Sequence, residues 1–424
     1  MNKKFILYRP GQIVSGPPVE DHPLRGKEMN SLTVIEGKSI QILDGKISSL
    51  IDNSEASKQI SSGVEFLDCS GKVLLPGLID SHTHILYAGE RREEFFQRLE
   101  GKSYSEILQS GNGIYRTVKA TRKATLDQLL AETGRRISKA ILNGTTTMEV
   151  KTGYGLSASS EIKMMEAIRG LKETSGLAVR GTFLAAHAIP EGMAENQYVD
   201  AICSEMIPSI PPWMEYVDVF CDKGAFGIES TRRIFQAAME KGLGIRLHSD
   251  ELQCIGCTGI VEEFPVKSVD HLIRSGKREM EMISRTGTIA TLLPTTAFSL
   301  NRNLMPDVSR FVENGIAFAI ATDSSPNVPN TDLLESIYLA VTACNTTVEQ
   351  AINAVTINAA HSLDFSGIKG ALAEGYDADV CVLDIEDYRD VVYRHGNRMV
   401  SDLIIDGKVA VRNFSPEEPI NSKS

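Results

Sequence analysis

The chain has 424 residues, of which 42% are hydrophobic and 23% are charged, an ordinary composition for a globular protein. This length allows two or three domains, or one α/β barrel with a smaller domain beside it. The formal net charge of −11 argues against nucleic acid or a membrane surface as a partner, because both favour a basic protein, whereas a small anionic substrate could still bind a locally basic pocket.

The N-terminal segment carries two lysines but no apolar stretch long enough for a signal peptide, and no later segment is apolar enough to span a membrane. The seven cysteines are scattered and odd in number, as in a reduced cytosolic protein. Cys254 and Cys257 form a single C-x-x-C, which we interpret as two small residues at the start of a helix. We therefore expect a cytoplasmic protein with reduced thiols.

Short strand-like segments occur near both ends of the chain. They are rich in β-branched and apolar residues and are separated by Gly-containing turns. We therefore predict one small β-sandwich domain assembled from residues 1–75 and 366–424. The strand-like segments are residues 32–35, 39–43, 378–384, 403–405 and 409–411.

Between the two ends, eight strand-like segments alternate with amphipathic helical segments. This alternation predicts an α/β fold, with a (β/α)₈ TIM-type barrel over residues 76–365. A doubly wound open sheet is the alternative, but it would need a nucleotide-binding motif, and the sequence contains neither G-x-G-x-x-G nor G-x-x-x-x-G-K-[ST]. The predicted strands are residues 77–84, 145–150, 179–187, 216–221, 244–248, 268–271, 288–293 and 317–323, and the predicted helices include 125–143, 160–174 and 230–241.

A His-x-His pair, His82 and His84, stands at the end of the first predicted barrel strand. On a strand, residues i and i+2 point to the same face, so both imidazoles could reach one metal ion. Imidazole is a suitable ligand for zinc or iron. A partly exposed pair on an edge strand is the alternative, and ligands at other strand ends decide between the two.

Other strand ends carry polar residues as well. The third strand ends at His187, the fifth at His248, the sixth at His271 and the eighth at Asp323. In a barrel, active-site groups lie at the C-terminal ends of the strands. Any one histidine could be a satisfied core residue, but the whole set favours a shared site.

This arrangement resembles the amidohydrolase superfamily, which has His-x-His on the first strand, histidines on the fifth and sixth, and aspartate on the eighth. The segments 356–360 and 369–379 are similar to the usual exit from that barrel into its β domain. Within the superfamily, three further segments closely resemble the imidazolonepropionases, the ring-opening hydrolases of histidine degradation, and the likeness extends over residues 30–412. These segments are residues 103–122, 149–156 and 182–190.

The resemblance implies one divalent or trivalent metal ion per chain, for which zinc and iron are both chemically suitable. Many binuclear relatives also use a carbamylated lysine at the end of the fourth strand, where this chain has Cys221, so we favour one metal. Lys151 ends the second strand, and there we expect a structural ion pair. The implied metal ligands are His82, His84, His248 and Asp323.

The implied reaction is hydrolysis of 4-imidazolone-5-propanoate to N-formimidoyl-L-glutamate, so the expected substrate is a small anion. Glu251, His271 and Asp323 are the candidates for the base that takes the water proton. His271 could instead stabilise the oxyanion. Glu251 could also be an ordinary helix-start carboxylate, although the family uses this position to contact the substrate ring.

Arg91 follows the metal-binding strand, and its guanidinium could grip the substrate carboxylate through two parallel hydrogen bonds. Tyr104, Tyr154 and His187 would complete the pocket, although Tyr104 alone could be a core tyrosine. Relatives are commonly homodimers, and by analogy we expect the same here.

The segment after Asp323 departs from the family pattern. Where the family has asparagine, glycine and a hydroxyl residue for substrate binding, this chain has Ser325, Asn327 and Val328. The metal site should survive these changes, whereas substrate choice could shift. We therefore keep a second activity open, such as a nucleobase deaminase or another cyclic amidase. A non-catalytic barrel is a third hypothesis, disfavoured because every expected metal ligand is present.

Overall fold

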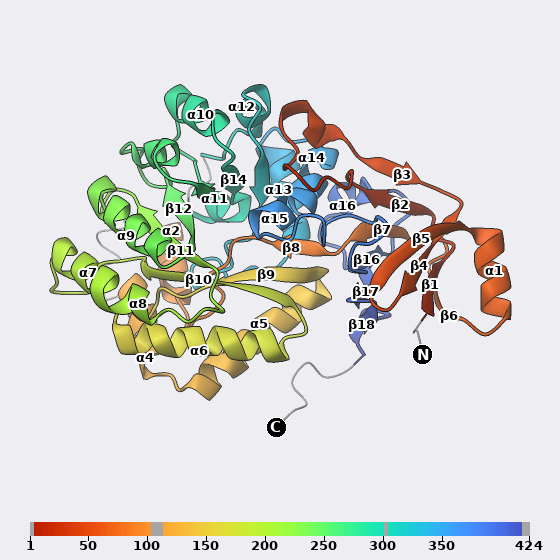
Figure 1. Ribbon diagram of the computed structural model, residues 1–424, viewed down its shortest axis with the longest axis horizontal. Helices are drawn as coiled ribbons and strands as arrows, with labels where there is room; N and C mark the ends of the chain where they lie inside the picture. The colour runs from red at the N-terminus through yellow and green to blue at the C-terminus, as the bar shows by residue number, and fades with distance from the viewer. Residues whose placement is uncertain (1–3, 103–112, 301–303, 418–424) are drawn as a thin grey trace.

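Eight parallel strands form the central barrel in the computed structural model, which describes residues 4–102, 113–300 and 304–417. The strands are hydrogen-bonded in chain order (Figure 1). Beyond the first and last strands, the Asp323 N–H donates to the His82 carbonyl (3.1 Å) and the His84 N–H donates to the Ser324 carbonyl (2.9 Å), which joins the two edges. The barrel strands are β8 Leu78–Asp80, β9 Thr145–Lys151, β10 Ala178–Ala186, β11 Tyr216–Cys221, β12 Gly244–Ser249, β13 Val266–His271, β14 Ile289–Leu292 and β15 Phe318–Ile320. This architecture confirms the predicted barrel.

Helices cover the outside of the barrel, so nearly every barrel-strand residue is buried (Figure 1). The helix α5 begins with a capping box, in which Thr125 and Gln128 each accept the other's backbone N–H. The helices that follow the barrel strands are α2 Arg92–Leu99, α4 Ile114–Lys123, α5 Leu126–Leu142, α6 Ala158–Thr174, α7 Glu195–Ala201, α8 Ile207–Ser209, α9 Ile228–Glu240, α10 Lys277–Ser284, α11 Pro294–Leu300, α12 Val308–Glu313, α13 Leu333–Ala343, α14 Val348–Ala354 and α15 Ile357–Ser362. Among the described residues, three short helical segments have 3-10 or π geometry rather than α geometry. They are η1 Gly26–Asn30, η2 Ile202–Met206 and η3 Cys257–Glu262.

The described residues form two further sheets, one from the N-terminal end alone and one that combines strands from both ends of the chain. One has the order β5-β4-β1-β6, and the other has the order β19-β18-β17-β16-β7-β2-β3. Their apolar faces meet in one core that includes Leu7, Ile42, Leu74, Val380 and Ile404, as a β-sandwich requires. The elements are β1 Lys4–Tyr8, β2 Gln12–Ser15, β3 Thr33–Ile35, β4 Lys38–Leu43, β5 Lys46–Asp52, α1 Asn53–Ser61, β6 Glu65–Asp68, β7 Val73–Pro76, β16 Val380–Leu383, α16 Asp390–Tyr393, β17 Val400–Ile405, β18 Lys408–Arg412 and β19 Ser415–Pro416.

The strand β7 links the sandwich to the barrel. It pairs with β2 in parallel and with β16 antiparallel, and the chain then passes through Gly77 into β8. The Gly77 N–H donates to the Asp379 carbonyl (2.9 Å). The predicted division of the chain at residues 76 and 365 stays a prediction, although the strands of each sheet fall on the expected sides of it.

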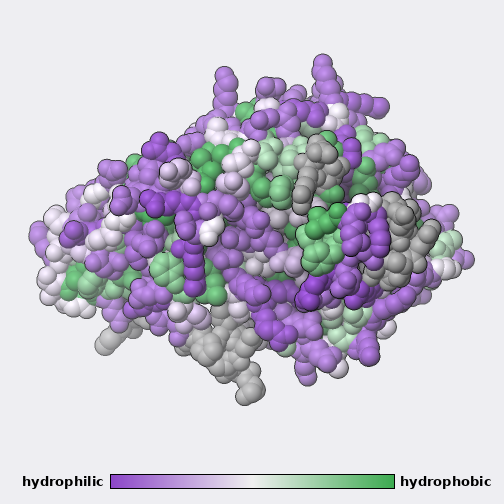
Figure 2. All heavy atoms as spheres, turned by 180° about the vertical axis from the view of Figure 1, so that it is seen from behind, coloured by the Kyte–Doolittle hydropathy of each residue, from purple (hydrophilic) through white to green (hydrophobic). Residues whose placement is uncertain are grey.

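Within the described residues, no helix is long and apolar enough to cross a bilayer. The face shown in Figure 2 is mostly hydrophilic, with apolar side chains in small separate patches. Such scattered exposure is ordinary for a folded domain.

Candidate metal centre and active site

The predicted ligands converge at the carboxyl end of the barrel. One detail of the prediction is wrong: β8 ends at Asp80, so His82 and His84 lie just beyond the strand rather than on it. Thr83 between them forms a bridge to Ser324, which keeps the segment extended. The two imidazoles therefore still point to the same side, as the i, i+2 argument requires.

Three imidazole nitrogens lie close together at the centre. His84 Nε2 is 3.2 Å from His82 Nε2 and 3.1 Å from His248 Nε2. Asp323 Oδ1 is 3.6 Å from His82 Nε2 and 3.5 Å from His84 Nε2. Four ligands at a zinc–nitrogen distance of 2.0–2.1 Å from a tetrahedral ion lie about 3.3 Å apart, so these separations fit one such ion.

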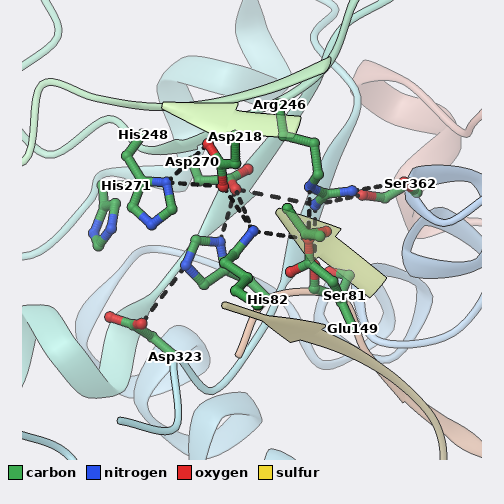
Figure 3. Close-up of polar contacts among 12 residues, drawn as sticks. Ser81, His82, Glu149, Asp218, Arg246, His248, Asp270, His271, Asp323 and Ser362 are labelled. Atoms are coloured by element: carbon green, nitrogen blue, oxygen red, sulfur yellow. Dashed lines mark hydrogen bonds and ion pairs between the residues drawn. The ribbon is translucent and has the colours of Figure 1, made fainter. Parts of the chain in front are cut away.

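Hydrogen bonds to two buried carboxylates determine which ring nitrogen of His82 and of His248 faces the centre of the cluster. His82 Nδ1 lies 2.7 Å from Asp270 Oδ2, and His248 Nδ1 lies 3.0 Å from Asp218 Oδ2 (Figure 3). Each Nδ1 therefore carries the proton and donates it, which leaves Nε2 as a bare lone pair facing its neighbours. Lone pairs directed at one another need a cation between them, so the residues present fit a metal ion.

Asp323 is held in place from a second side. Thr296 Oγ1 donates to its Oδ2 at 2.7 Å, so Oδ1 remains directed at the histidines. Burial raises the pKa of Asp323 to about 6, although the Thr296 hydrogen bond acts in the opposite direction. The residue has a φ of +52°, a left-handed conformation that is uncommon for residues other than glycine and is often found at functional sites.

Glu251 and His271 lie beside the metal ligands. His271 ends β13, and its Nε2 is 3.6 Å from Glu251 Oε2. Burial raises the pKa of Glu251 to about 8, and the Asp323 carboxylate contributes in the same direction. The Glu251 backbone is fixed by Asp222, whose carboxylate accepts the N–H groups of residues 251–253 at 2.8–2.9 Å.

Arg91 is buried but already paired. Its Nε and Nη2 donate to the two oxygens of Glu94, both at 2.7 Å. Glu94 also accepts from Arg98 Nη1 (2.8 Å) and from the Gly113 N–H (3.0 Å). The side of the Arg91 guanidinium that carries Nε and Nη2 is therefore occupied by Glu94. A substrate carboxylate would have to bind the opposite side of this group.

Tyr154 and His187 pack beside the proposed metal ligand His84. The His187 ring stacks on His84 with centroids 4.7 Å apart, and the Tyr154 ring lies 5.2 Å from that of His187. Burial lowers the pKa of His187 to about 3, so this ring is neutral. The predicted Tyr104 lies outside the described residues.

The departing segment after Asp323 forms a tight turn. Ser325 and Val328 exchange backbone hydrogen bonds at 3.0 and 3.1 Å, and the Ser325 hydroxyl also accepts the Val328 N–H (3.3 Å). The Asn327 side chain accepts a long hydrogen bond from Arg98 Nη1 (3.4 Å). Ser325 and Asn327 thus use their side chains, and Val328 uses its main chain, for local contacts within and beside the turn.

The cysteine prediction is wrong in one respect. Cys221 and Cys257 are joined by a disulfide, with Cα atoms 6.0 Å apart. Cys257 does begin η3, as expected, but the end of β11 lies next to it in space. The 36-residue separation hides this proximity in the sequence. The C-x-x-C partner, Cys254, is a free thiol.

Sequence reasoning missed the carboxylates behind the histidines, Asp218 and Asp270. The signal was present: both are charged residues inside apolar strands, where an unpaired charge would be costly. Lys151, expected to form an ion pair, lies between Glu149 Oε1 and Asp218 Oδ2, at 2.8 Å from each.

Comparisons with known proteins agree with this geometry. The profile of the amidohydrolase family matches residues 73–410. An imidazolonepropionase from Thermoplasma acidophilum is 39% identical over 386 residues, covering 91% of this chain and 92% of its own. One from Geobacillus sp. (strain WCH70) is 36% identical over 419 residues, covering 97% and 99%.

Solved structures share the fold at low identity. A zinc complex of an atrazine chlorohydrolase from Arthrobacter aurescens has a TM-score of 0.71 at 16% identity, covering 98% of this chain and 97% of its own. A guanine deaminase from C. acetobutylicum with bound guanine has a TM-score of 0.66 at 17% identity, covering 96% and 100%.

The barrel, the His-rich centre and the family match define this protein as a member of the amidohydrolase family. Both the family and the buried His/Asp group support a metal cofactor. Within that family, the chain belongs with the imidazolonepropionases, to which it is similar over nearly its whole length.

Proposed function

We propose that the protein hydrolyses 4-imidazolone-5-propanoate to N-formimidoyl-L-glutamate, a step of histidine degradation. The observation that carries this proposal is the close approach of His82, His84, His248 and Asp323 in a chain 34–39% identical to imidazolonepropionases. Water adds to the ring carbonyl carbon, the ring C–N bond breaks, and the released nitrogen takes up a proton.

The proposed metal is a single zinc or iron ion bound by these four side chains. When bound, it supplies Lewis acidity, lowering the pKa of a coordinated water and polarising the substrate carbonyl. Zinc is supported by the separations of 3.1–3.6 Å between neighbouring ligand atoms, and imidazole and carboxylate also suit iron.

The remaining polar groups handle the proton and the developing charge. Glu251 is proposed to take the proton of the attacking water in its ionised form and to deliver it to the leaving nitrogen. His271, a few ångströms from that carboxylate, is proposed to stabilise the negative charge on the carbonyl oxygen. Asp323 and His271 remain alternatives for the base.

The substrate carboxylate is proposed to bind near Arg91, with Tyr104, Tyr154 and His187 around the ring. Arg91 and Arg98 share the single carboxylate of Glu94, so this corner keeps a net positive charge that favours an anion. Ser325, Asn327 and Val328 would border the substrate from the turn after Asp323. A homodimeric assembly and a cytoplasmic location stay predictions, which sedimentation and cell fractionation would test.

The test is the ultraviolet decay of 4-imidazolone-5-propanoate with the purified protein, before and after chelation and after zinc or iron add-back. We expect rapid loss of the ring chromophore, abolished by chelation and restored by metal. A folded, metal-loaded protein that leaves this substrate intact would contradict the proposal.

A second amidohydrolase activity is favoured by one observation, the altered turn of residues 325–328. A panel of nucleobases and cyclic amides, assayed on the same preparation, distinguishes the two. Faster turnover of a nucleobase than of the imidazolone would favour the deaminase alternative.

A further inference from the structure

Five charged side chains fill the inside of the barrel beneath the histidines. All five are fully buried. They come from the adjacent strands β11, β12 and β13 and from β9, which is separated from β11 by β10. Buried ion pairs contribute little net stability and are often replaceable by apolar residues. A cluster of this kind therefore invites a functional explanation. The five are Glu149, Lys151, Asp218, Arg246 and Asp270.

The cluster contacts the metal centre through its two aspartates. Asp218 accepts from His248 Nδ1 and Asp270 accepts from His82 Nδ1, as described above. Outer carboxylates of this kind fix the tautomer and ring orientation of a metal-binding histidine and raise its basicity.

Lys151 holds the aspartates themselves. Its Nζ is 2.8 Å from Asp218 Oδ2 and 4.0 Å from Asp270 Oδ2, so one ammonium lies between the carboxylates behind both histidines. Glu149 Oε1, at 2.8 Å, completes its surroundings and fixes its position. Without this cation, three carboxylates would repel one another in a dry interior, and their side chains would turn apart.

Arg246 ties the same cluster to the backbone that carries the ligands. Its Nε is 3.1 Å from Glu149 Oε1, and its Nη2 donates to the Ser81 carbonyl at 3.0 Å, directly before His82. The cluster thus contacts the metal-binding segment at a side chain and at the main chain.

We propose that Lys151 is a positioning residue for the metal ion: by bridging Asp218 and Asp270 it holds His248 and His82 with Nε2 directed at a common point. It touches neither metal nor substrate and acts through the two carboxylates. This proposal rests on the metal site of the proposed function, and it states in addition that Lys151 increases the affinity of that site for the metal ion.

The experiment measures zinc affinity directly, by competition with a chromophoric chelator, on metal-stripped full-length variants. We expect Lys151→Met to weaken zinc binding by roughly 10- to 100-fold, because the loss of an outer-shell partner typically has this effect. Asp270→Asn keeps the shape but removes one charge, and we expect a loss in the same range. This second variant decides the question if Lys151→Met does not fold.

The matched control is Lys369→Met. Lys369 is also a buried lysine among carboxylates, with Asp379 at 2.8 Å, Asp377 at 3.1 Å and Asp406 at 3.2 Å, but it lies at the sandwich. We expect lower thermal stability with unchanged zinc affinity. Unchanged zinc affinity in folded Lys151→Met, or in Asp270→Asn, would overturn the proposal.

A separate variant distinguishes failure of the inference from failure of the metal site. His84→Ala removes a proposed ligand that lies outside the charge cluster. If it binds zinc as tightly as the unaltered protein, the proposed metal site itself is wrong. If it loses zinc while Lys151→Met does not, only the positioning role of Lys151 is wrong.

Discussion

Glu251 is largely buried, with 13% of its side chain exposed, and it lies beside His271; both features bear on its use as a base. Burial and the charge of Asp323 raise its pKa to about 8, so much of it is protonated at neutral pH. Because a base must be ionised, we expect kcat/KM to rise with pH through the pKa of Glu251 and then level off. A bound cation that offsets the charge of Asp323 moves this midpoint below 8.

The variant Glu251→Gln tests this role. We expect kcat to fall by about 10²- to 10⁴-fold, the usual contribution of a positioned base, with unchanged metal content. The rising limb of the pH–rate profile should also disappear. A variant that is slow but retains the same limb would transfer the role of base to His271 or Asp323.

Glu161 supports the loop that carries Tyr154. Its buried carboxylate accepts the N–H groups of Gly153 (3.2 Å), Gly155 (2.8 Å) and Leu156 (2.8 Å). We expect Glu161→Gln to raise KM by roughly 10-fold, because hydrogen bonds to a charged group contribute about 1.5–3 kcal/mol. Steady-state kinetics provide the measurement.

The control for this variant is Glu166→Gln on the same helix, α6, where the side chain is 46% exposed and only loosely paired with Arg169. It should leave KM unchanged. If Glu161→Gln lowers the melting temperature but not substrate affinity, the carboxylate only stabilises the loop.

Candidate ligands could be named from the sequence because a histidine at a strand end can be recognised without knowing any partner. The structure brings His82, His84 and Asp323 together and places His248 Nε2 3.1 Å from His84 Nε2, and their role as metal ligands stays a prediction. The outer carboxylates were not predicted, because which aspartate meets which histidine depends on the strand register. Asp270 lies opposite His248 in the β12–β13 register, yet its side chain bonds to His82.

Among the elements, the link from β7 to β8 allows little change. A Cβ added to Gly77 would lie 2.3 Å from Thr146 Oγ1 on β9 and 2.5 Å from its Cγ2. We expect Gly77→Ala to destabilise the protein by about 1–3 kcal/mol, the usual cost of overpacking a close contact. Urea-induced unfolding, followed by circular dichroism, measures the change in midpoint.

Gly287→Ala is the matched comparison, because a Cβ there meets nothing within 4 Å and its φ is not in the left-handed region. It should be neutral or stabilising by about 0.4–1 kcal/mol, through lower entropy of the unfolded chain. Equal stability of the two alanine variants would mean that the β7–β8 link adjusts without cost.

The predicted bounds of helices and strands agree with the structure where the hydrophobic periodicity of the sequence is strong. Helix α5 was expected at residues 125–143 and spans Leu126–Leu142, while β11 matches its expected range. The first and last barrel strands are shorter than predicted, β15 being only Phe318–Ile320. The residues that follow these strands are held in part by side chains. Thr322, for example, donates its N–H and its hydroxyl to the buried side chain of Asp80.

At the scale of the whole molecule, metal binding should stabilise the fold. Of the proposed ligands, His82 and His84 follow β8, His248 lies on β12 and Asp323 follows β15, so a shared ion would join the first and last strands of the barrel. A ligand at 100 times its Kd contributes about 2.7 kcal/mol to stability. We therefore expect zinc to raise the melting temperature and a chelator to lower it, as measured by calorimetry.

The same scans on His84→Ala should show little response to zinc. Identical melting temperatures of the unaltered protein with and without chelator would indicate that no stabilising metal is bound.

The overall architecture was predictable from the repeated strand–helix order and from the similar strand-like composition of the two ends of the chain. The pairing of β1 with β6, by contrast, follows only from how the sheets close.

The joint construction of the sandwich from both chain ends has a consequence for biosynthesis. The strand β7 ends at residue 76, and its partner β16 begins at residue 380, so roughly 300 residues must be translated between them. At about 5–20 residues per second, the edge of β7 waits on the order of 15–60 s for its partner while the barrel emerges from the ribosome. During that interval the nascent chain presents an unpaired apolar edge, a target for chaperones and a starting point for aggregation.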